Sequence, residues 1–290
     1  DDDHALSLLS SMGVSEFSMC FGRFDADPGR LILGAGIPGM QYDDVPVVGQ
    51  RHWAVQLVGA GFGSSSVCSQ PPYCAAIVDS GTSLLAGPKD LVYSMIDGLQ
   101  QQLAEDCSNV DEMPNLEFTV GPPHAPVTLS LLPEFYVLRT TDAATTDDAA
   151  SAASSTGKRR ESCSLMFMDL DMHDHKYGPV WILGAPFMRA YSTRFSRGVS
   201  GVSGGVTPPS GAAAGSDAAT GAAPRRLGFA RIANSTNPCA GCPSAGGEGS
   251  PDEQVRERQP VQPLPAVSMQ HARIAMWATL AGDGRPSHIL

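Results

Sequence analysis

The sequence predicts an all-β protein with one or two short helices. Between Phe17 and Val137 the chain is mostly short apolar runs interrupted by Gly, Pro and Asp, which is the pattern of many short strands. One stretch within this region, Lys89–Leu99, instead repeats its apolar residues at helical spacing. These two observations favour a sheet protein in which helices are the exception.

The elements follow one another in chain order. The clearest predicted strands are Leu31–Leu33, Trp53–Val58, Ile77–Val78 and Leu116–Val120. Pro88 stands at the start of the helical stretch, a position that tolerates proline because the first amides of a helix have no partner within it. Pro186–Tyr191 is a second, shorter helix candidate.

At residues 75–83 the chain runs from an apolar strand into a tight turn rich in hydroxyl groups, and a single carboxylate stands where the two meet. The aliphatic residues up to Val78 suit a buried strand, and the hydroxyls that follow can donate to an ionised oxygen. Gly81 is expected to take a backbone conformation that other residues avoid. Asp79 is therefore the candidate for chemistry, and the alternative is a turn aspartate that caps backbone amides.

The string Asp79-Ser80-Gly81-Thr82-Ser83 resembles the active-site turn of the pepsin-like aspartic proteases. Further segments resemble that family in the same order, namely Phe17–Phe21 with Gly29–Gly34, Trp181–Gly184 with Phe187–Tyr191, and Arg226–Ala230. The resemblance covers the carboxyl-terminal lobe only. It implies a pepsin-like acid protease lobe of the double-psi β-barrel type.

The resemblance also implies a division of the chain into residues 1–16 as a leader or remnant, 17–232 as the lobe and 233–290 as a low-complexity tail. Residues 141–160 and 198–224 are biased towards small and polar residues. We predict that both are disordered insertions, because they cannot bury enough apolar surface to offset the entropy of ordering. The chain begins at Asp1 without a methionine or signal peptide, so we interpret it as part of a longer product.

The resemblance assigns catalytic roles by position to Asp79, Ser80, Gly81 and Thr82. Asp79 is implied to be the second of two catalytic aspartates. Ser80 would hydrogen-bond to the turn of a partner lobe, and Thr82 would donate to the outer carboxylate oxygen. Gly81 and Ser83 would meet the substrate backbone.

Three further residues are implied to bind substrate. Ile77 and Ile182 match positions that line the pockets beside the scissile bond, although plain core is the alternative for both. His52 lies where the family often has a tyrosine. Ala185 stands where the family commonly has an aspartate, and its presence is expected to weaken a supporting hydrogen bond.

Peptide hydrolysis in this family needs two carboxylates that share one proton and hold a water between them. The chain has one Asp-Ser-Gly turn and no Asp-Thr-Gly turn. The resemblance therefore implies an amino-terminal lobe with the first aspartate as a partner, polypeptides as substrates, and neither a metal nor an organic cofactor. One alternative is a homodimer of identical chains, and another is a non-catalytic peptide-binding lobe or pseudoenzyme.

The charge and the cysteines restrict partners and location. The net charge of −11 argues against nucleic acid and anionic membranes as partners. No apolar run approaches the roughly 18 to 20 residues that span a bilayer. Seven cysteines favour an oxidising compartment, so we expect the secretory pathway, with the protein extracellular or in an acidic vacuole or lysosome.

The resemblance implies two disulfides, Cys68–Cys74 and Cys107–Cys163, with reduced buried thiols as the alternative. Asn234 is a candidate glycosylation acceptor.

Two other groups of residues have side chains that can bind a metal ion. For Cys239 and Cys242, a local disulfide or unpaired thiols is favoured over a zinc or redox pair, because the tail that holds them lacks a second cysteine pair. The run His173-Asp174-His175 is expected to be a solvated polar hairpin rather than a metal site.

Overall fold

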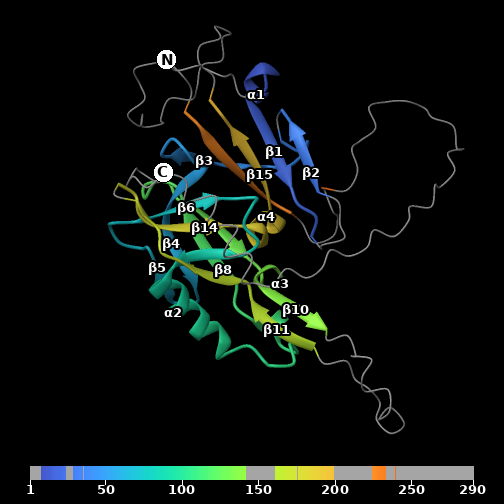
Figure 1. Ribbon diagram of the computed structural model, residues 1–290, viewed down its shortest axis with the longest axis vertical. Coiled ribbons are helices and arrows are strands. Elements are labelled where there is room, and N and C mark those ends of the chain that lie inside the picture. Colours follow the sequence, from blue (N-terminus) through green and yellow to red (C-terminus); the bar gives the residue numbers. More distant parts are fainter. Residues whose placement is uncertain are drawn as a thin grey trace, which may run out of the picture. The chain divides into compact units, whose positions relative to one another are not determined.

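Most of the apolar runs form strands, as expected for an all-β protein. The computed structural model describes residues 8–23, 29–34, 36–141, 161–174, 176–198, 224–232 and 239. Within these residues fourteen strands join one sheet and two more form a separate hairpin (Figure 1). The prediction of an all-β fold with a few short helices is confirmed.

One part of the sheet is antiparallel throughout, in the order β3-β16-β15-β1-β2. Its strands are β1 (Glu16–Cys20), β2 (Arg30–Leu33), β3 (Asp43–Val48), β15 (Tyr191–Ser196) and β16 (Arg226–Arg231). Strand β2 lies at the edge, and Leu31 and Leu33 on it are 62% and 46% exposed. This edge is an apolar surface that no described strand covers.

The other part of the sheet contains the turn at Asp79 and runs in the order β12-β7-β14-β6-β4. Its strands are β4 (Ala54–Phe62), β6 (Cys74–Val78), β7 (Leu85–Pro88), β12 (Phe167–Leu170) and β14 (Gly178–Leu183). Four shorter or outer strands extend it, namely β5 (Ser65–Val67), β8 (Leu116–Val120), β9 (Val127–Leu131) and β13 (His173–Asp174). The separate hairpin is β10 (Val137–Thr141) with β11 (Glu161–Leu165).

Strand β14 lies between the two strands that flank the turn at Asp79. It is parallel to β6, with Leu183 opposite Val78, and antiparallel to β7, with Leu183 opposite Leu85. Consecutive strands β6 and β7 are therefore not neighbours in the sheet. The turn that joins them has to pass over the end of β14.

Both predicted helices are present. Helix α2 (Lys89–Gln100) has Pro88 at its N-cap and buries Val92, Met95 and Leu99 along one face. The second is α4 (Ala185–Ala190), which begins directly after β14. The single turns α1 (Leu8–Ser11), α3 (Pro133–Tyr136) and the 3₁₀ turn η1 (Val110–Glu112) were not expected, since so few residues show no periodicity.

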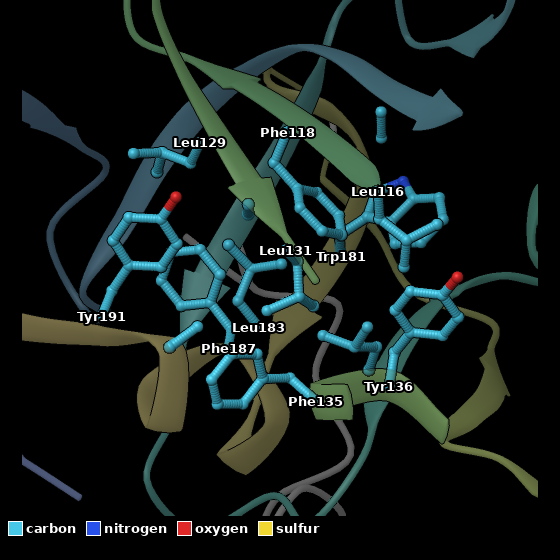
Figure 2. Packing of buried hydrophobic residues seen from close by; sticks show 14 of the residues in the cluster. Leu116, Phe118, Leu129, Leu131, Phe135, Tyr136, Trp181, Leu183, Phe187 and Tyr191 are labelled. Atoms are coloured by element: carbon cyan, nitrogen blue, oxygen red, sulfur yellow. The ribbon is translucent and has the colours of Figure 1, made fainter. Parts of the chain in front are cut away.

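Aromatic residues of distant elements meet in the main core, which Figure 2 shows from close by. Trp181 of β14 and Phe187 of α4 are fully buried. The Phe187 ring stacks on that of Tyr191 at a centroid distance of 5.1 Å and meets Phe118 of β8 edge-on at 6.3 Å. The core therefore anchors β14 and α4, the two elements beneath the turn at Asp79.

Three disulfides cross-link the described residues. Cys68–Cys74 and Cys107–Cys163 are the two pairs expected from the resemblance. The third, Cys20–Cys239, joins residues 219 apart in sequence. The expectation that Cys239 forms a local pair or stays unpaired is therefore wrong, because the chain beyond β16 returns to the end of β1, where Ile232 also packs.

Some predictions fall outside the described residues. These are the leader up to residue 7, nearly all of both insertions, the glycosylation acceptor Asn234 and the tail apart from Cys239. The domain boundaries at 16 and 232 remain predictions. Among the described helices, none has the length and hydropathy needed to cross a membrane.

Candidate active site

Strand β6 delivers Asp79 to the end of a buried layer. All five of its residues are buried, with β4 on one side and β14 on the other. The Asp79 amide donates to the Leu183 carbonyl at 3.2 Å, and the Val78 amide donates to the Trp53 carbonyl at 2.9 Å. The main chain is thus fixed from both sides up to the residue that carries the carboxylate.

Both carboxylate oxygens of Asp79 accept hydrogen bonds from their own turn. The Gly81 amide donates to Oδ1 at 2.9 Å, and the Thr82 hydroxyl donates to Oδ2 at 2.5 Å. Thr82 is buried, whereas Asp79 is half-buried and Ser80 and Gly81 are exposed. The turn therefore holds one carboxylate in a fixed orientation and leaves it open to solvent on one side, as a proton-transfer group requires.

Gly81 serves the turn differently from the expectation. Its backbone does not have a positive φ, so the prediction of a conformation closed to other residues is wrong. A Cβ at this position would lie 3.3 Å from Asp79 Oδ1. The absent side chain matters because it lets the Gly81 amide approach the carboxylate without crowding it.

Gly184 is the residue over which the turn passes. A Cβ there would lie 2.3 Å from the carbonyl oxygens of both Thr82 and Leu84, much closer than atoms can approach. The next amide, that of Ala185, donates to the Thr82 carbonyl at 2.7 Å. The main chain of Ala185 thus supports the turn although its side chain lacks the carboxylate that the family commonly has there.

Ser80 and Ser83 both lie on the open side of the turn, and both are exposed. Ser80 contributes to a cavity of about 390 Å³ that is otherwise lined by Met19, Cys20, Phe21, Gly29, Arg30 and Leu31. These residues come from the end of β1, the start of β2 and the positions next to them, Phe21 and Gly29. The side of the turn that carries Ser80 is therefore continuous with the apolar edge at β2.

The three residues expected to bind substrate lie around the turn. Ile77 and Ile182 are direct partners across β6 and β14, and they are 7% and 5% exposed. By strand alternation they face away from Val78 and Leu183, which pack in the main core. His52 is half-buried in the turn between β3 and β4. Their role as pocket residues stays a prediction.

Sequence reasoning missed Arg225, whose guanidinium donates to the His52 carbonyl at 3.3 Å. Its position just before β16 is far from His52 in sequence, and no motif marks it.

The hairpin at His173 differs from the expectation as well. Asp174 is buried, and its Oδ1 accepts hydrogen bonds from the amides of Lys176 at 2.8 Å and Tyr177 at 2.9 Å. Its side chain therefore closes a turn and does not face solvent. Within the described part of the chain, no group of three or more His, Cys, Asp or Glu side chains is placed to hold a metal ion.

Comparisons with known proteins agree with this geometry. The family model described as eukaryotic aspartyl protease matches residues 10–205. Cathepsin D of Clupea harengus is 33% identical over 184 residues, which cover 60% of this chain and 41% of that protein. Cathepsin E of Mus musculus is 32% identical over 163 residues, covering 53% and 35%, and pepsin A of Sus scrofa is 29% identical over 182 residues, covering 59% and 40%.

The chain spans less than half the length of these relatives. The family model nevertheless matches well over half of the chain and includes the turn at Asp79 and the strand and helix beneath it. The chain therefore belongs to the eukaryotic aspartyl protease family.

Proposed function

We propose that this chain is the carboxyl-terminal lobe of an aspartic endopeptidase and that Asp79 is the second of its two catalytic aspartates. The observation that carries the proposal is the Asp79 carboxylate itself, with a donor on each oxygen and one side open to solvent. Ser80, Gly81 and Thr82 share the catalytic turn, and Ser83, Ile77, Ile182 and His52 contact the polypeptide substrate.

In this mechanism a water molecule lies between Asp79 and the aspartate of the other lobe. One carboxylate takes a proton from the water as it attacks the peptide carbonyl, and the other, protonated, donates to the carbonyl oxygen. The resulting tetrahedral species collapses when the peptide nitrogen is protonated and leaves. The hydrogen bonds from Gly81 and Thr82 keep the Asp79 oxygens oriented throughout.

The face that carries Ser80 is where the amino-terminal lobe docks. Leu31 is exposed on the edge strand β2 and also lines the cavity that Ser80 adjoins. An uncovered edge strand has unpaired amides and carbonyls that can pair with another chain. Docking here would bring the partner's catalytic turn next to Ser80.

The test uses the full-length polypeptide, with all sequence that precedes Asp1 in its gene. Wild-type protein should cleave a quenched fluorogenic peptide at acidic pH, and a statine-type inhibitor should block cleavage. Asp79→Asn keeps the shape of the side chain and removes its ability to take a proton, so activity should fall by several orders of magnitude. Asp97→Asn, on an exposed position of α2, is the matched control.

Retention of peptide cleavage by Asp79→Asn would contradict the catalytic role. If the wild-type protein binds statine peptides but cleaves nothing, the second candidate function, a non-catalytic peptide-binding lobe, replaces the first. The single Asp-Ser-Gly turn in this chain is the observation that favours this alternative. Activity of this chain alone at concentrations where it dimerises would favour the homodimer.

The three disulfides support a location in the secretory pathway, since they form and persist under oxidising conditions. An extracellular or lysosome-like compartment would supply both the oxidising history and the acidity that a shared proton requires.

A further inference from the structure

The described hydrogen bonds and ring contact of the Arg225 side chain fall on one short segment, the turn between β3 and β4. Its guanidinium donates to the Gln50 carbonyl at 2.8 Å and to the His52 carbonyl at 3.3 Å. The same group lies over the ring of Trp53, with Cζ 4.3 Å from the ring centroid. Three contacts from one side chain thus hold residues 50–53.

Ion pairing does not explain why an arginine stands here. Among the described residues no carboxylate lies within ion-pair distance of Arg225. The register that pairs Ser196 with Arg226 places Arg197 directly opposite it, and like charges at such positions repel. Burial of the guanidinium and the charge of Arg197 both lower the pKa of Arg225. An unpaired, half-buried charge is costly, so its contacts with the turn must compensate.

The turn that Arg225 holds lies against the catalytic turn. The Trp53 carbonyl accepts the Val78 amide, one residue before Asp79. The paired register of β4 and β6 ends at Ala54 and Ile77, and its extension by two residues would bring His52 opposite Asp79. Any shift of the turn would therefore move His52 relative to the carboxylate.

The described residues also tie this turn at Trp53 and Gly49, since the Trp53 ring meets that of Phe17 edge-on at 6.2 Å and the Trp53 carbonyl accepts a hydrogen bond from the Val78 amide. The Trp53 ring packs edge-on against Phe195 at a centroid distance of 5.2 Å, and the Gly49 amide donates to the Tyr177 hydroxyl at 3.3 Å. None of these contacts reaches His52 itself. Among the described contacts, the hydrogen bond from the Arg225 guanidinium is the one made to the His52 main chain.

We propose that Arg225 is a positioning residue for substrate selectivity, which acts by fixing His52 beside Asp79. The proposal rests on the function proposed above. The planar guanidinium can donate to two carbonyls while its face covers an indole ring, and the single ammonium group of lysine cannot do both. Arg225→Met should leave residues 50–53 free to move, and Arg225→Lys should restore the function only in part.

The experiment is a double-mutant cycle in the full-length protein with peptides that differ at one residue near the scissile bond. His52→Ala first identifies the peptide position whose selectivity depends on His52. At that position Arg225→Met should reduce selectivity by about tenfold, the range expected for a change in pocket contacts. In the double variant the loss should equal that of His52→Ala alone, because Arg225 acts through His52.

Arg226→Met is the matched control, since Arg226 is the neighbouring arginine and donates instead to the Asp44 carbonyl. The inference is overturned if the two losses add in the double variant, if Arg226→Met changes selectivity equally, or if Arg225→Met slows all peptides alike.

A second measurement does not depend on activity. Amide hydrogen exchange at residues 50–53 should be faster in Arg225→Met and unchanged in Arg226→Met. Unchanged exchange in both variants overturns the inference. If no peptide is cleaved or bound by the wild-type protein, the endopeptidase proposal and the selectivity role fail together, and the exchange data then show whether the turn still depends on Arg225.

Discussion

At Asp79, neighbours in the same turn both orient the carboxylate and leave it accessible to solvent. The Gly81 amide and the Thr82 hydroxyl each hold one carboxylate oxygen, while the exposed Ser80 and Gly81 leave the group accessible. The same hydrogen bonds would suit a capping aspartate in any turn. What separates this turn from an ordinary one is its place at the end of a fully buried strand, next to a cavity and an uncovered sheet edge.

Removal of the Thr82 hydroxyl should weaken this arrangement without changing the shape of the side chain. Thr82→Val should destabilise the chain by about 1–2 kcal/mol, since a hydrogen bond to a charged but partly solvated group is lost. In the full-length protein, kcat should fall by at least about tenfold because the carboxylate is no longer held in place. Thr82→Ser keeps the hydroxyl and should retain most of both properties. Equal losses in the two variants would show that the methyl group, and not the hydroxyl, matters.

A side chain at Gly184 should be poorly tolerated. Gly184→Ala places a Cβ within 2.3 Å of two main-chain oxygens, which cannot rotate away as a side chain would. We expect a loss of about 3 kcal/mol in urea unfolding, together with loss of the proposed activity, because the turn at Asp79 must shift. Gly59→Ala is the control, since its Cβ would meet atoms no closer than 3.4 Å. A Gly184→Ala protein as stable as Gly59→Ala would contradict the close approach.

At the scale of elements, α3 is tied to the chain before β8 by a buried hydroxyl. The Tyr136 hydroxyl donates to the Pro114 carbonyl at 2.6 Å, and burial raises the pKa of Tyr136 well above its ordinary value. The unfolded chain would lose this proton near the ordinary tyrosine pKa of about 10. The folded chain retains it, so this stability is complete below that pH and is lost as the pH rises further.

Alkaline unfolding should therefore depend on Tyr136. Between about pH 10 and 11 the wild-type chain should lose up to about 1.4 kcal/mol of stability per pH unit from this residue, and Tyr136→Phe should lose correspondingly less. The measurement is urea unfolding at several pH values with free thiols blocked. Tyr93→Phe, on the exposed face of α2, is the control. An unchanged pH slope in Tyr136→Phe would show that the hydroxyl is not shielded from water.

Sequence reasoning succeeded for elements whose signal is local. The period of Lys89–Leu99 and the apolar run before Asp79 each lie within one short stretch, so both elements were predictable. The close approach at Gly184 could not be predicted, because it exists only once β14 lies between β6 and β7. The contacts of Arg225 could not be predicted for a similar reason, because they join segments far apart in the chain.

The predicted backbone conformation of Gly81 is wrong, because the turn needs space for the Asp79 carboxylate at this position and not a left-handed backbone. Cysteine spacing was also insufficient to find the Cys20–Cys239 pair, whose partners lie at opposite ends of the described chain.

At the scale of the whole molecule, the Cys20–Cys239 disulfide ties the segment after the last strand to the end of β1, beside the cavity that Ser80 adjoins. Cys239→Ser should destabilise the chain by about 2–5 kcal/mol, since long closed loops give large disulfide effects. Urea unfolding measures the loss, and Cys242→Ser serves as the control. A Cys239–Cys242 pair in non-reducing peptide mapping would contradict the long-range link.

The position of β14 between β6 and β7 also determines when, during synthesis of the chain, the turn at Asp79 can reach its final geometry. Asp79 is synthesised long before Leu183 and Gly184. Its amide nevertheless bonds to the Leu183 carbonyl, and its turn packs against Gly184. A nascent chain that has not yet made β14 lacks the support on which its carboxylate depends. The hydrogen bonds and the close packing that support the Asp79 turn are thus complete only once the chain has been made as far as Gly184.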